Sequence, residues 1–352
     1  MSNLGEGLAA LLPQAEGNPL AMMRMAALMR KNGQDEEALG LCNRALTLAP
    51  DDLALAAQGR DFLSKGVPGW HFAIVADAVR NAAYDAALRR AISPGMKVLE
   101  IGAGSGILAM MAARAGAAEV VTCEMNPVIA QTAQGIIERN GYGDRVRIFR
   151  GHSDKLTLAE LGGRFDILVS EIVSNTLLGE DVLPAHEKAM RDLLKPGAQV
   201  IPARGRVRIA LAEDLQGEKH AMGAVDGFDL SPFNDLARPV RYFSPGHERL
   251  GLRSAPADLF DFDFGTAKYC APATTEISLR SQGGRVNGIA QWVALKMDAQ
   301  GNYENHPAPG AESCWALVFH SFPASIDTAP GQEIRIAGSH DRHHLTIWAE
   351  GV

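Results

Sequence analysis

The pattern of apolar and polar positions changes twice along the chain. In residues 19–52 apolar side chains recur every three or four positions, which predicts two amphipathic helices. Between residues 95 and 212 short apolar strands alternate with helical stretches, as in a parallel sheet wound by helices. From about residue 213 short alternating strands are separated by Gly, Pro and Asn, as in an antiparallel sandwich or barrel. The expected fold has a helical segment (1–66), an α/β Rossmann-like domain (67–204) and an antiparallel β-barrel or sandwich domain (205–352).

The N-terminal helical segment has features of one tetratricopeptide unit. Ala38, Ala45 and Pro50 stand where such a unit, of about 34 residues, carries its small packing residues and its terminal proline. A single unit buries little surface by itself. Two interpretations follow: a module that binds a partner or forms a dimer, and a helical cap packed on the rest of the chain.

The composition fits a globular protein of two or three units. The chain has 352 residues, of which 47% are apolar and 21% charged. No apolar run approaches the roughly 20 residues that span a membrane, and the N-terminal sequence lacks the basic and apolar regions of a secretory signal. The four cysteines lie far apart without a CxxC pair, which fits a reducing cytoplasm better than a disulfide framework or a zinc site. We therefore expect a cytoplasmic protein with no membrane partner.

Nucleic acid and metal are not expected as ligands. The formal charge is −7, whereas binding to phosphates requires clustered Lys and Arg. An acidic surface is compatible with a basic substrate. The segment SHDRHH contains His340, Asp341, His343 and His344, but it is predicted to be a surface turn between two strands, with no further cluster of metal ligands.

A glycine-rich turn follows the first strand of the α/β region. In VLEIGAGSGILA, Gly102, Gly104 and Gly106 lie between a strand and a helix, where glycines keep the turn tight and let a ligand touch the backbone. This GxGxG spacing differs from the dinucleotide fingerprint GxGxxG. Glu124 ends the next strand, about 20 residues on, where a carboxylate can bind both ribose hydroxyls. Together with Glu100 inside the motif, these residues predict an S-adenosylmethionine site; a nicotinamide site and a purely structural turn are the alternatives.

Three polar residues follow the third strand, where the adenine of such a cofactor is bordered. They are His152, Ser153 and Asp154. Asp154 can accept a hydrogen bond from the exocyclic amine, and it is equally suited to be the N-cap of a helix. We expect Ser153 and Asp154 at the cofactor site.

Two glutamates flank one short loop beyond the fourth strand. Glu171 follows the apolar strand FDILVS, and Glu180 comes nine positions later. Ligands of α/β proteins bind at the carboxyl ends of the strands. Both carboxylates can face the cofactor if the loop folds back, and Ser174, Asn175 and Gly179 permit such a turn. A carboxylate pair beside a sulfonium suits a cationic, planar substrate rich in donors, and guanidinium fits this description best.

From His71 to about Arg208 the chain resembles the protein arginine methyltransferase family, because the glycine loop and the glutamate pair of that family's double-E loop occur in order. The tetratricopeptide-like N-terminus and the pattern WHF…D…RN…Y most resemble its monomethylating and symmetrically dimethylating branches. GFDLS, SCWALVF and LTIW resemble its β-barrel, so the resemblance covers roughly residues 68 to 350. It implies methyl transfer from S-adenosylmethionine to a guanidino nitrogen of arginine in a protein or peptide, with Glu171 and Glu180 as catalytic residues.

The resemblance also implies roles for residues outside these motifs. Arg80 and His71 would contact the methionine carboxylate of the cofactor. Residues 71–92 have the pattern of one continuous helix, in which Asp77 and Arg80 share a face. Asp77 and Trp315 are expected on the substrate side of the site.

The sequence departs from the family on that substrate side. The paired tyrosines that often precede this helix are absent, and the family's Thr-His-Trp loop appears as Ser313, Cys314 and Trp315. In the family the loop histidine pairs with the aspartate aligned to Asp77. Free arginine or another small guanidino compound is therefore an alternative substrate. Cys314 is expected to be a buried packing thiol rather than a catalytic group.

The dimerisation arm of the family corresponds to a short segment near residues 213–240. The resemblance leaves a homodimer open. A second alternative function is a partner-binding scaffold whose methyltransferase has decayed, against which the intact glycine loop and both glutamates argue. Methylation of an amide or exocyclic amine is disfavoured, because SEIVSN lacks the Asn/Asp-Pro-Pro-aromatic signature of those enzymes.

Overall fold

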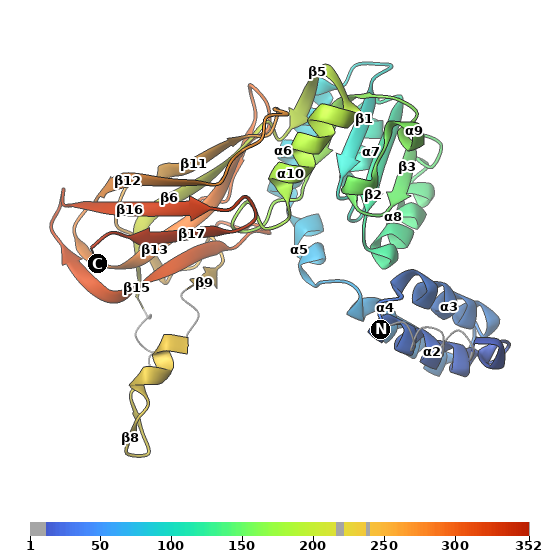
Figure 1. The fold of residues 1–352 in the computed structure, drawn as a ribbon, viewed down its shortest axis with the longest axis horizontal. Helices are drawn as coiled ribbons and strands as arrows, with labels where there is room; N and C mark the ends of the chain where they lie inside the picture. Colours follow the sequence, from blue (N-terminus) through green and yellow to red (C-terminus); the bar gives the residue numbers. More distant parts are fainter. Residues whose placement is uncertain (1–11, 216–221, 237–239, 352) are drawn as a thin grey trace.

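The computed structural model describes residues 12–215, 222–236 and 240–351. Figure 1 shows helices of the N-terminal segment at one end, an α/β part in the middle and long antiparallel strands at the other end. The predicted fold class is confirmed in each of these parts. Some predicted segments fall partly outside the described residues: the helical segment at 1–11, the arm at 216–221 and 237–239, and the last residue of the β domain at 352.

Three helices near the N-terminus pack around a small core of their own, and we call residues 12–66 the helical module. The helices are α2 (Pro19–Lys31), α3 (Asp35–Leu48) and α4 (Leu53–Lys65). The Asn18 and Asp52 side chains accept hydrogen bonds from backbone N–H groups at the starts of α2 and α4, which stabilises both helix beginnings. The two helices predicted from apolar spacing are thus present, and Met22 and Ala26 are fully buried in this core.

A five-stranded parallel sheet forms the middle part, in the order β3-β2-β1-β4-β5. Its strands are β1 (Lys97–Ile101), β2 (Glu119–Glu124), β3 (Val146–Arg150), β4 (Phe165–Ser170) and β5 (Leu194–Ile201). Its helices are α5 (Trp70–Ala76), α6 (Ala78–Ala91), α7 (Ile107–Arg114), α8 (Pro127–Arg139), α9 (Leu158–Leu161) and α10 (Val182–Lys188). Because all strands run the same way, the loops after their carboxyl ends meet at one edge. None of the helices in the described part is long and apolar enough to cross a membrane.

The single helix predicted for residues 71–92 is wrong, because the chain breaks at Asp77. α5 ends at Ala76 and α6 begins at Ala78, while Asp77 itself is extended, with φ −71° and ψ 91°. The Asp77 side chain accepts a hydrogen bond from the Arg80 N–H and so caps α6. Apolar spacing continues through the break, which is why the sequence pattern predicts one helix.

Two antiparallel sheets form the third part, which we call the β domain. The larger has the order β10-β6-β13-β15-β9, with β11 also paired to β6 and β14 to β13; the smaller has the order β12-β16-β17. The strands are β6 (Arg204–Asp214), β9 (Val240–Phe243), β10 (Leu250–Leu252), β11 (Ala257–Asp263), β12 (Ala273–Arg280), β13 (Gly284–Lys296), β14 (Asn302–Glu304), β15 (Leu317–Thr328), β16 (Glu333–His340) and β17 (Leu345–Ala349). One cluster of buried side chains runs from Leu168 in β4 to Ile289 in β13, so this domain and the α/β part share a core.

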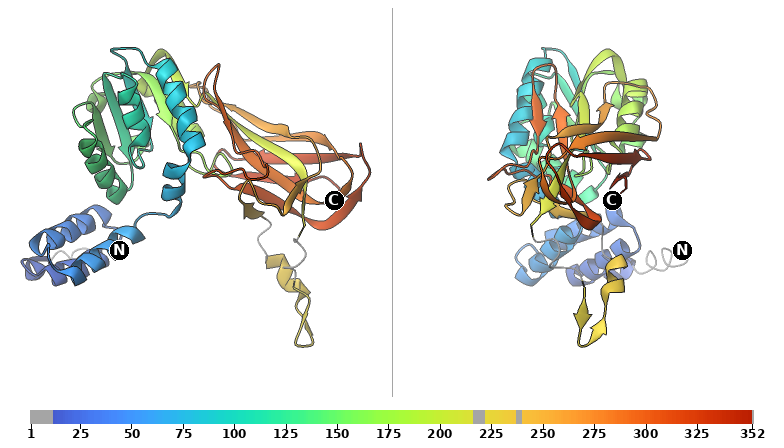
Figure 2. Two further views of the ribbon diagram at one scale, coloured as in Figure 1. Left: turned by 180° about the vertical axis from the view of Figure 1, so that it is seen from behind. Right: turned by 90° about the vertical axis from the view of Figure 1, so that its left-hand side faces the viewer.

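An arm projects from the β domain, at the place where a short arm was predicted (Figures 1 and 2). It contains β7 (Ala224–Val225), β8 (Phe228–Asp229) and the 3-10 turn Ser231–Leu236. At the base of the arm the buried Asp214 carboxylate forms ion pairs with Arg241, which lies in β9, and with Arg249, which lies between β9 and β10. The exposed apolar side chains of the arm are Met222, Val225, Phe228, Leu230, Phe233 and Leu236.

Gly288 provides a test of how tightly the β domain is packed. It is buried in β13 beside a register shift, and a Cβ there would lie 2.5 Å from the His320 carbonyl oxygen and against the Phe319 ring. We expect Gly288→Ala to lower the free energy of unfolding by about 3 kcal/mol, because a strand backbone and a packed ring have little room to move. Urea denaturation measures this loss.

Gly135 is the matched control, since it is exposed on α8 and a Cβ there would meet no atom within 4 Å. Gly135→Ala should leave stability unchanged or raise it by about 1 kcal/mol. Equal effects of the two substitutions would contradict the packing described for β13.

Candidate active site

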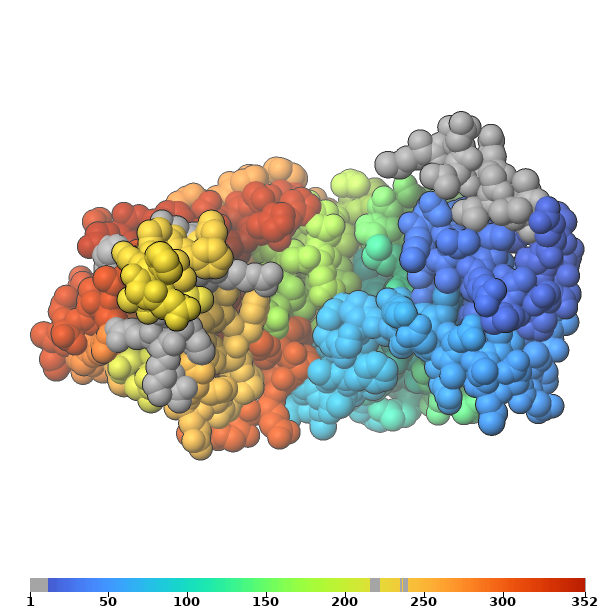
Figure 3. All heavy atoms as spheres, turned by 90° about the horizontal axis from the view of Figure 1, so that it is seen from below, coloured from blue at the N-terminus to red at the C-terminus, as the bar shows by residue number. Residues whose placement is uncertain are grey.

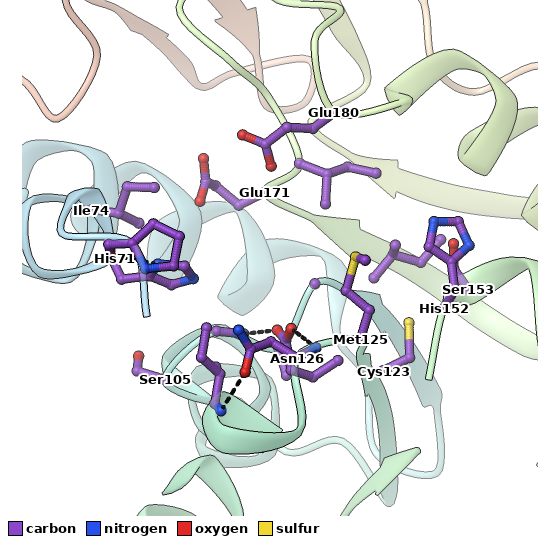
Figure 4. Close-up of a pocket in the computed structure, with 18 of the residues that line it drawn as sticks. His71, Ile74, Ser105, Cys123, Met125, Asn126, His152, Ser153, Glu171 and Glu180 are labelled. Carbon is purple, nitrogen blue, oxygen red and sulfur yellow. Dashed lines mark hydrogen bonds between the residues drawn. The ribbon is translucent and has the colours of Figure 1, made fainter. Parts of the chain in front are cut away.

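A cavity of about 1030 Å³ opens at the carboxyl ends of the parallel strands. It is lined by the loops after β1, β2, β3 and β4, by α5 and by part of the helical module. In Figure 4 the Glu171 and Glu180 carboxylates lie close together on one side, with His71 and Ile74 beside them. The predicted site residues in the lining are His71, Arg80, Glu100, Gly102, Gly104, Glu124, Ser153, Glu171 and Glu180. The predicted site residues outside the lining are Asp77, Gly106, Asp154 and Trp315.

The glycine loop forms one wall of the cavity. Gly102 and Gly104 have φ values of 85° and 52°, which L side chains rarely adopt. A Cβ on Gly102 would lie 2.8 Å from Cγ2 of Ile172, whereas a Cβ on Gly104 would enter open space. Gly106 packs instead against α8, where a Cβ would lie 3.0 Å from Ile137. Gly102 therefore lets this loop approach the loop after β4, and Gly104 leaves room for a ligand.

Glu124 ends β2 with its carboxylate held by two backbone groups. Oε2 accepts a hydrogen bond from Gly104 N at 3.1 Å, and Oε1 accepts one from Asn126 N at 2.8 Å. A carboxylate has about four acceptor positions, so some remain for the hydroxyls of a ligand. Met125, which the sequence analysis missed, also lines the cavity and is 68% exposed. A carboxylate beside an exposed apolar side chain and an open glycine suits a nucleoside, so these residues fit S-adenosylmethionine.

The polar residues after β3 separate into two groups. Ser153 and His152 line the cavity, where both are drawn in Figure 4. Asp154 is outside the lining, and its carboxylate lies 3.0 Å from His152 Nδ1 and 3.5 Å from Lys155 Nζ. It lies within the short turn Ser153–Lys155 and not at the N-cap position, which His152 occupies. A contact between Asp154 and adenine therefore stays a prediction without support from this geometry.

Glu100 lies on β1. It borders the cavity but is completely buried from solvent. Burial raises the pKa of its carboxyl group to about 8, and the nearby Glu124 charge adds to that rise. At neutral pH the carboxyl therefore favours its protonated form, which can donate a hydrogen bond beneath the glycine loop.

Glu171 forms a buried ion pair with Arg80. The Arg80 Nη1 atom lies 2.8 Å from Glu171 Oε2, and the two side chains are 1% and 8% exposed. Burial raises the pKa of Glu171 to about 8; the Arg80 charge opposes this rise and the Glu180 charge adds to it. Burial also raises the pKa of Glu180, helped by Glu124. Two carboxyl groups thus share a cavity with Arg80, which is paired with Glu171. This arrangement favours the binding of a second cation, supplied by a ligand.

Both predicted ligands of the methionine carboxylate border the cavity. Arg80 does so while it is paired with Glu171, and its Nη2 donates to Asn81 Oδ1. His71 stacks on Trp70 with ring centroids 3.8 Å apart, and its Nδ1 lies 3.0 Å from the Pro68 carbonyl oxygen. Their contact with the cofactor stays a prediction.

The loop between the glutamates folds back as predicted. Ser174 Oγ accepts hydrogen bonds from Thr176 N and Gly179 N, and the Ser174 carbonyl accepts one from Leu177 N at 2.9 Å. Asn175 Oδ1 accepts a hydrogen bond from Ala316 N of the β domain. The turn chemistry of the loop and the β domain together bring both carboxylates to one cavity.

Asp77 joins α6 to the β domain below the cavity. Its Oδ2 accepts hydrogen bonds from Tyr303 Oη at 3.0 Å and from Cys314 N at 2.9 Å, while Tyr303 Oη lies 2.6 Å from Ser313 Oγ. Burial acts to raise the pKa of Asp77, but hydrogen bonds from the backbone N–H groups of Arg80 and Cys314 hold it below its ordinary value. Tyr303 and a backbone amide thus occupy the role that the missing loop histidine would have. The sequence gives little signal for this, because Tyr303 lies 226 positions from Asp77.

Trp315 contacts the glutamate loop, and its place on the substrate side stays a prediction. The residue is 3% exposed, and its Nε1 donates to the Val173 carbonyl at 2.7 Å. Burial and the Glu171 charge raise the pKa of the Cys314 thiol well above its ordinary value, which keeps it protonated, as expected of a packing thiol.

The turn after β16 is less exposed than predicted. His343 and His344 are on the surface, but His340 and Arg342 are 4% and 7% exposed. His343 Nδ1 lies 2.5 Å from Oδ1 of Asp181, the residue after Glu180. Within the described ranges, no three His, Cys, Asp or Glu side chains are grouped so that they could hold a metal ion.

The fold and the cavity define an S-adenosylmethionine-dependent methyltransferase: a parallel sheet whose first strand leads into a glycine loop, with a carboxylate at the end of the next strand. A family model described as ribosomal protein L11 methyltransferase (PrmA) matches residues 86–201. The arginine N(omega)-methyltransferase of Streptomyces achromogenes subsp. streptozoticus is 36% identical over 331 residues, which cover 92% of this chain and 90% of that protein. The chain therefore belongs to the arginine N-methyltransferase family.

Longer relatives and solved structures agree with this. Protein arginine N-methyltransferase 7 of Danio rerio is 30% identical over 303 residues, 76% of this chain and 44% of that protein, so the chain spans less than half of its length. The structure described as the Trypanosoma brucei PRMT1 enzyme–prozyme heterotetrameric complex with AdoHcy superposes with a TM-score of 0.70 at 21% identity, covering 81% of this chain and 99% of that chain. Protein arginine methyltransferase 10 of Arabidopsis thaliana gives 0.65 at 19% identity, covering 78% and 89%. These structures support the same fold.

The cofactor residues can be tested by isothermal titration with S-adenosylmethionine. We expect Gly104→Arg to abolish binding because its side chain would occupy the open space beside the loop, and Glu124→Ala to weaken it at least about 10-fold through loss of the ribose contacts. Asp154→Asn is the control and should bind normally, because that carboxylate lies outside the lining. Unaltered binding in Gly104→Arg and Glu124→Ala would refute the site.

The Asp77 network can be tested with Tyr303→Phe. Loss of the hydroxyl removes one hydrogen bond to a buried carboxylate, so the free energy of unfolding should fall by about 1 to 2 kcal/mol at pH 7. The pKa of Asp77 is depressed in the fold, so this stabilisation exists above the ordinary pKa of 3.8 and is lost as pH falls through the folded-state value. The deficit should therefore shrink in acid. Tyr242→Phe, on an exposed ring, should show no deficit at any pH, and a Tyr303→Phe variant as stable as wild type would contradict the network.

Proposed function

We propose that this protein transfers a methyl group from S-adenosylmethionine to a guanidino nitrogen of arginine. The observation that carries the proposal is the pair Glu171 and Glu180, which face one cavity together with Gly104 and Glu124. Membership of the arginine N-methyltransferase family supports the reaction. The AdoHcy named for the Trypanosoma brucei complex supports the cofactor.

The glutamates act on the charge of the guanidinium. A free guanidinium is a poor nucleophile because its positive charge is delocalised. Charge-assisted hydrogen bonds to Glu171 and Glu180 would hold the group and draw positive charge toward the bound N–H groups, away from the reacting nitrogen. Because the Glu171 side chain is largely buried, its contacts act with little screening by water. S-adenosylmethionine, when bound, supplies the methyl group as an electrophile.

The reaction releases one proton, and Glu171 is suited to receive it. Burial favours its protonated form, while the guanidinium and Arg80 favour the ionised form. The carboxylate is therefore ionised when the cationic substrate is bound, and it can take up the proton as that positive charge is lost. Arg80, which borders the cavity beside Glu171, would also contact the methionine carboxylate of the cofactor, with His71 near it.

We propose two substrates that could supply the guanidinium, and the better supported one comes first. Arginine in a protein or peptide is the first, supported by the relatives named protein arginine N-methyltransferase 7. Free arginine is the second candidate. The observation that favours it is the match along 90% of a relative named arginine N(omega)-methyltransferase, a protein of nearly the same extent as this chain.

A homodimer is the proposed assembly. The arm exposes Val225, Phe228 and Phe233 to solvent, and α5 and the start of α6 expose Phe72 and Val79. Exposed apolar patches of this kind mark sites of protein association. Figures 1 and 2 show the arm projecting from the β domain, and in Figure 3, seen from below, it lies in yellow in front of that domain. Sedimentation of wild type and of Phe228→Ser/Phe233→Ser tests this, and a monomeric wild-type protein would contradict it.

A reducing compartment, such as the cytoplasm, is the proposed location. All four cysteines are free, and Cys42 and Cys123 are buried. Detection of any of them as a disulfide in protein isolated from cells would contradict this proposal.

The proposed reaction is tested by transfer of a labelled methyl group to free arginine, to arginine-rich peptides and to lysate proteins. Glu171→Gln and Glu180→Gln should each lower turnover at least about 100-fold, because each removes a charge that stabilises the transition state. Affinity for S-adenosylhomocysteine should stay within several-fold of wild type. Glu138→Gln, an exposed change on α8, should have no effect. Normal methylation by both active-site variants would exclude the clamp, and the preferred acceptor identifies the carrier.

Substrate binding should release a proton from Glu171. Burial raises its pKa above the ordinary value of 4.5 when no substrate is bound, and a bound guanidinium lowers that pKa again. Titration of arginine substrate into the S-adenosylhomocysteine complex at pH 7, in buffers of different ionisation enthalpy, should show proton release. The kcat/KM value should rise as pH increases toward 8. Glu171→Gln should abolish the release, and proton uptake by wild type would contradict the assignment.

A further inference from the structure

Backbone strain is concentrated where the glutamate loop meets the β domain. In the described part of the chain, the non-glycine residues with positive φ are Leu177 (74°), Asp181 (58°), Asp226 (51°) and Arg342 (87°). Asp181, directly after Glu180, and Arg342, in the turn between β16 and β17, lie at one junction, because His343 of that turn contacts Asp181; Leu177 lies within the loop itself. Such conformations persist only when the surrounding contacts hold them, and they cluster at functional sites.

His343 contacts the end of the glutamate loop directly. Its Nδ1 lies 2.5 Å from Oδ1 of Asp181, which adjoins Glu180 and precedes α10. Both side chains are about half exposed, so the contact adds little to global stability. It can nevertheless fix the direction in which the chain leaves Glu180.

Arg342 holds α10 from the same turn. Its Nη2 donates to Glu187 Oε2 at 2.8 Å and its Nη1 donates to the Cys270 carbonyl at 3.2 Å. The guanidinium also lies over the Tyr269 ring, 4.0 Å from its centroid. Glu187 Oε1 accepts a further hydrogen bond from Cys270 N. The buried Arg342–Glu187 pair makes α10 a fixed support rather than a free helix after the loop.

α10 connects both ends of the glutamate loop. It begins at Val182, two residues after Glu180, and its His186 Nε2 lies 2.6 Å from Oγ of Ser170, which precedes Glu171. The Ser170 carbonyl in turn accepts a hydrogen bond from the Tyr84 hydroxyl at 2.9 Å. A shift of α10 would therefore move both glutamates.

The two ends of the loop differ in how their carboxylates are held. Glu171 is paired with Arg80, whereas among the residues that the structure describes Glu180 has no ion-pair partner. The Glu171 and Glu180 charges also disfavour each other when no cation lies between them. The position of Glu180 therefore depends on its backbone, which Asp181 and α10 set.

We propose that Arg342 and His343 are positioning residues for the substrate clamp: through Glu187 and Asp181 they hold Glu180 in the direction from which it can bind a guanidinium. The proposal rests on the proposed function, in which Glu180 contacts that group. Geometric errors of about 1 Å in such a clamp cost up to on the order of 100-fold in rate.

The test compares wild type with His343→Ala, His343→Asn and the control His344→Ala. His344 is adjacent and more exposed, and its side chain contacts Asp341 of the same turn rather than the glutamate loop. Asn can still donate one hydrogen bond to Asp181. Arg342→Lys, which keeps the charge but loses the forked contacts, is the second variant.

We expect His343→Ala to raise the KM for the guanidino substrate and to lower kcat/KM on the order of 10-fold, with S-adenosylhomocysteine affinity and melting temperature unchanged. His343→Asn should recover most of this loss, Arg342→Lys should lose at least as much as His343→Ala, and His344→Ala should match wild type. Deuterium exchange of amides within 171–181 should accelerate in His343→Ala and Arg342→Lys alone.

Equal kcat/KM and equal exchange in His343→Ala and wild type would overturn the proposal, as would an equal loss in His344→Ala. Exchange does not depend on turnover. If wild type methylates no arginine substrate, the proposed function fails, and the exchange rates still decide whether this turn holds the loop.

Discussion

The structure depends on how two carboxyl groups, one of them buried, are kept beside one another. Glu171 and Glu180 open into the same cavity, and burial disfavours the charged form of each. The Arg80–Glu171 ion pair compensates for one of these charges and leaves the other available. Removing either member of such a buried pair leaves an uncompensated charge, so Arg80 serves structure and chemistry together. The site is arranged for a cation that enters from outside.

That arrangement requires the β domain as much as the α/β part. At the break between α5 and α6, one carboxylate oxygen of Asp77 caps α6. The other accepts hydrogen bonds from the Tyr303 hydroxyl and the Cys314 N–H of the β domain. Asn175 and Val173 of the glutamate loop take hydrogen bonds from the segment around Trp315. The family's loop histidine is replaced here, but the β domain is still hydrogen-bonded to Asp77, through the Tyr303 hydroxyl and the Cys314 N–H. The shared hydrophobic core is consistent with a site assembled by both parts.

The local parts of this account could be predicted from the sequence, whereas the long-range contacts could not. Strand alternation, the glycine spacing and the position of Glu124 at the end of a strand have short-range physical causes, and each appears where it was expected. The fold-back of the glutamate loop likewise followed from Ser174 and Gly179. The break at Asp77 was missed because a capping aspartate inside continuous apolar spacing resembles a helix interior. Tyr303 was missed because its partner is far away in sequence, and the contact of Trp315 with the glutamate loop was missed for the same reason.

The central claim is that Glu171 and Glu180 bind one guanidinium together. A crystal structure of the protein with S-adenosylhomocysteine and an arginine substrate tests this most directly. We expect guanidino nitrogens within about 3 Å of carboxylate oxygens from both glutamates, with Arg80 still in contact with Glu171. A guanidinium bound elsewhere in the cavity, or held by one glutamate while the other faces away, would contradict it.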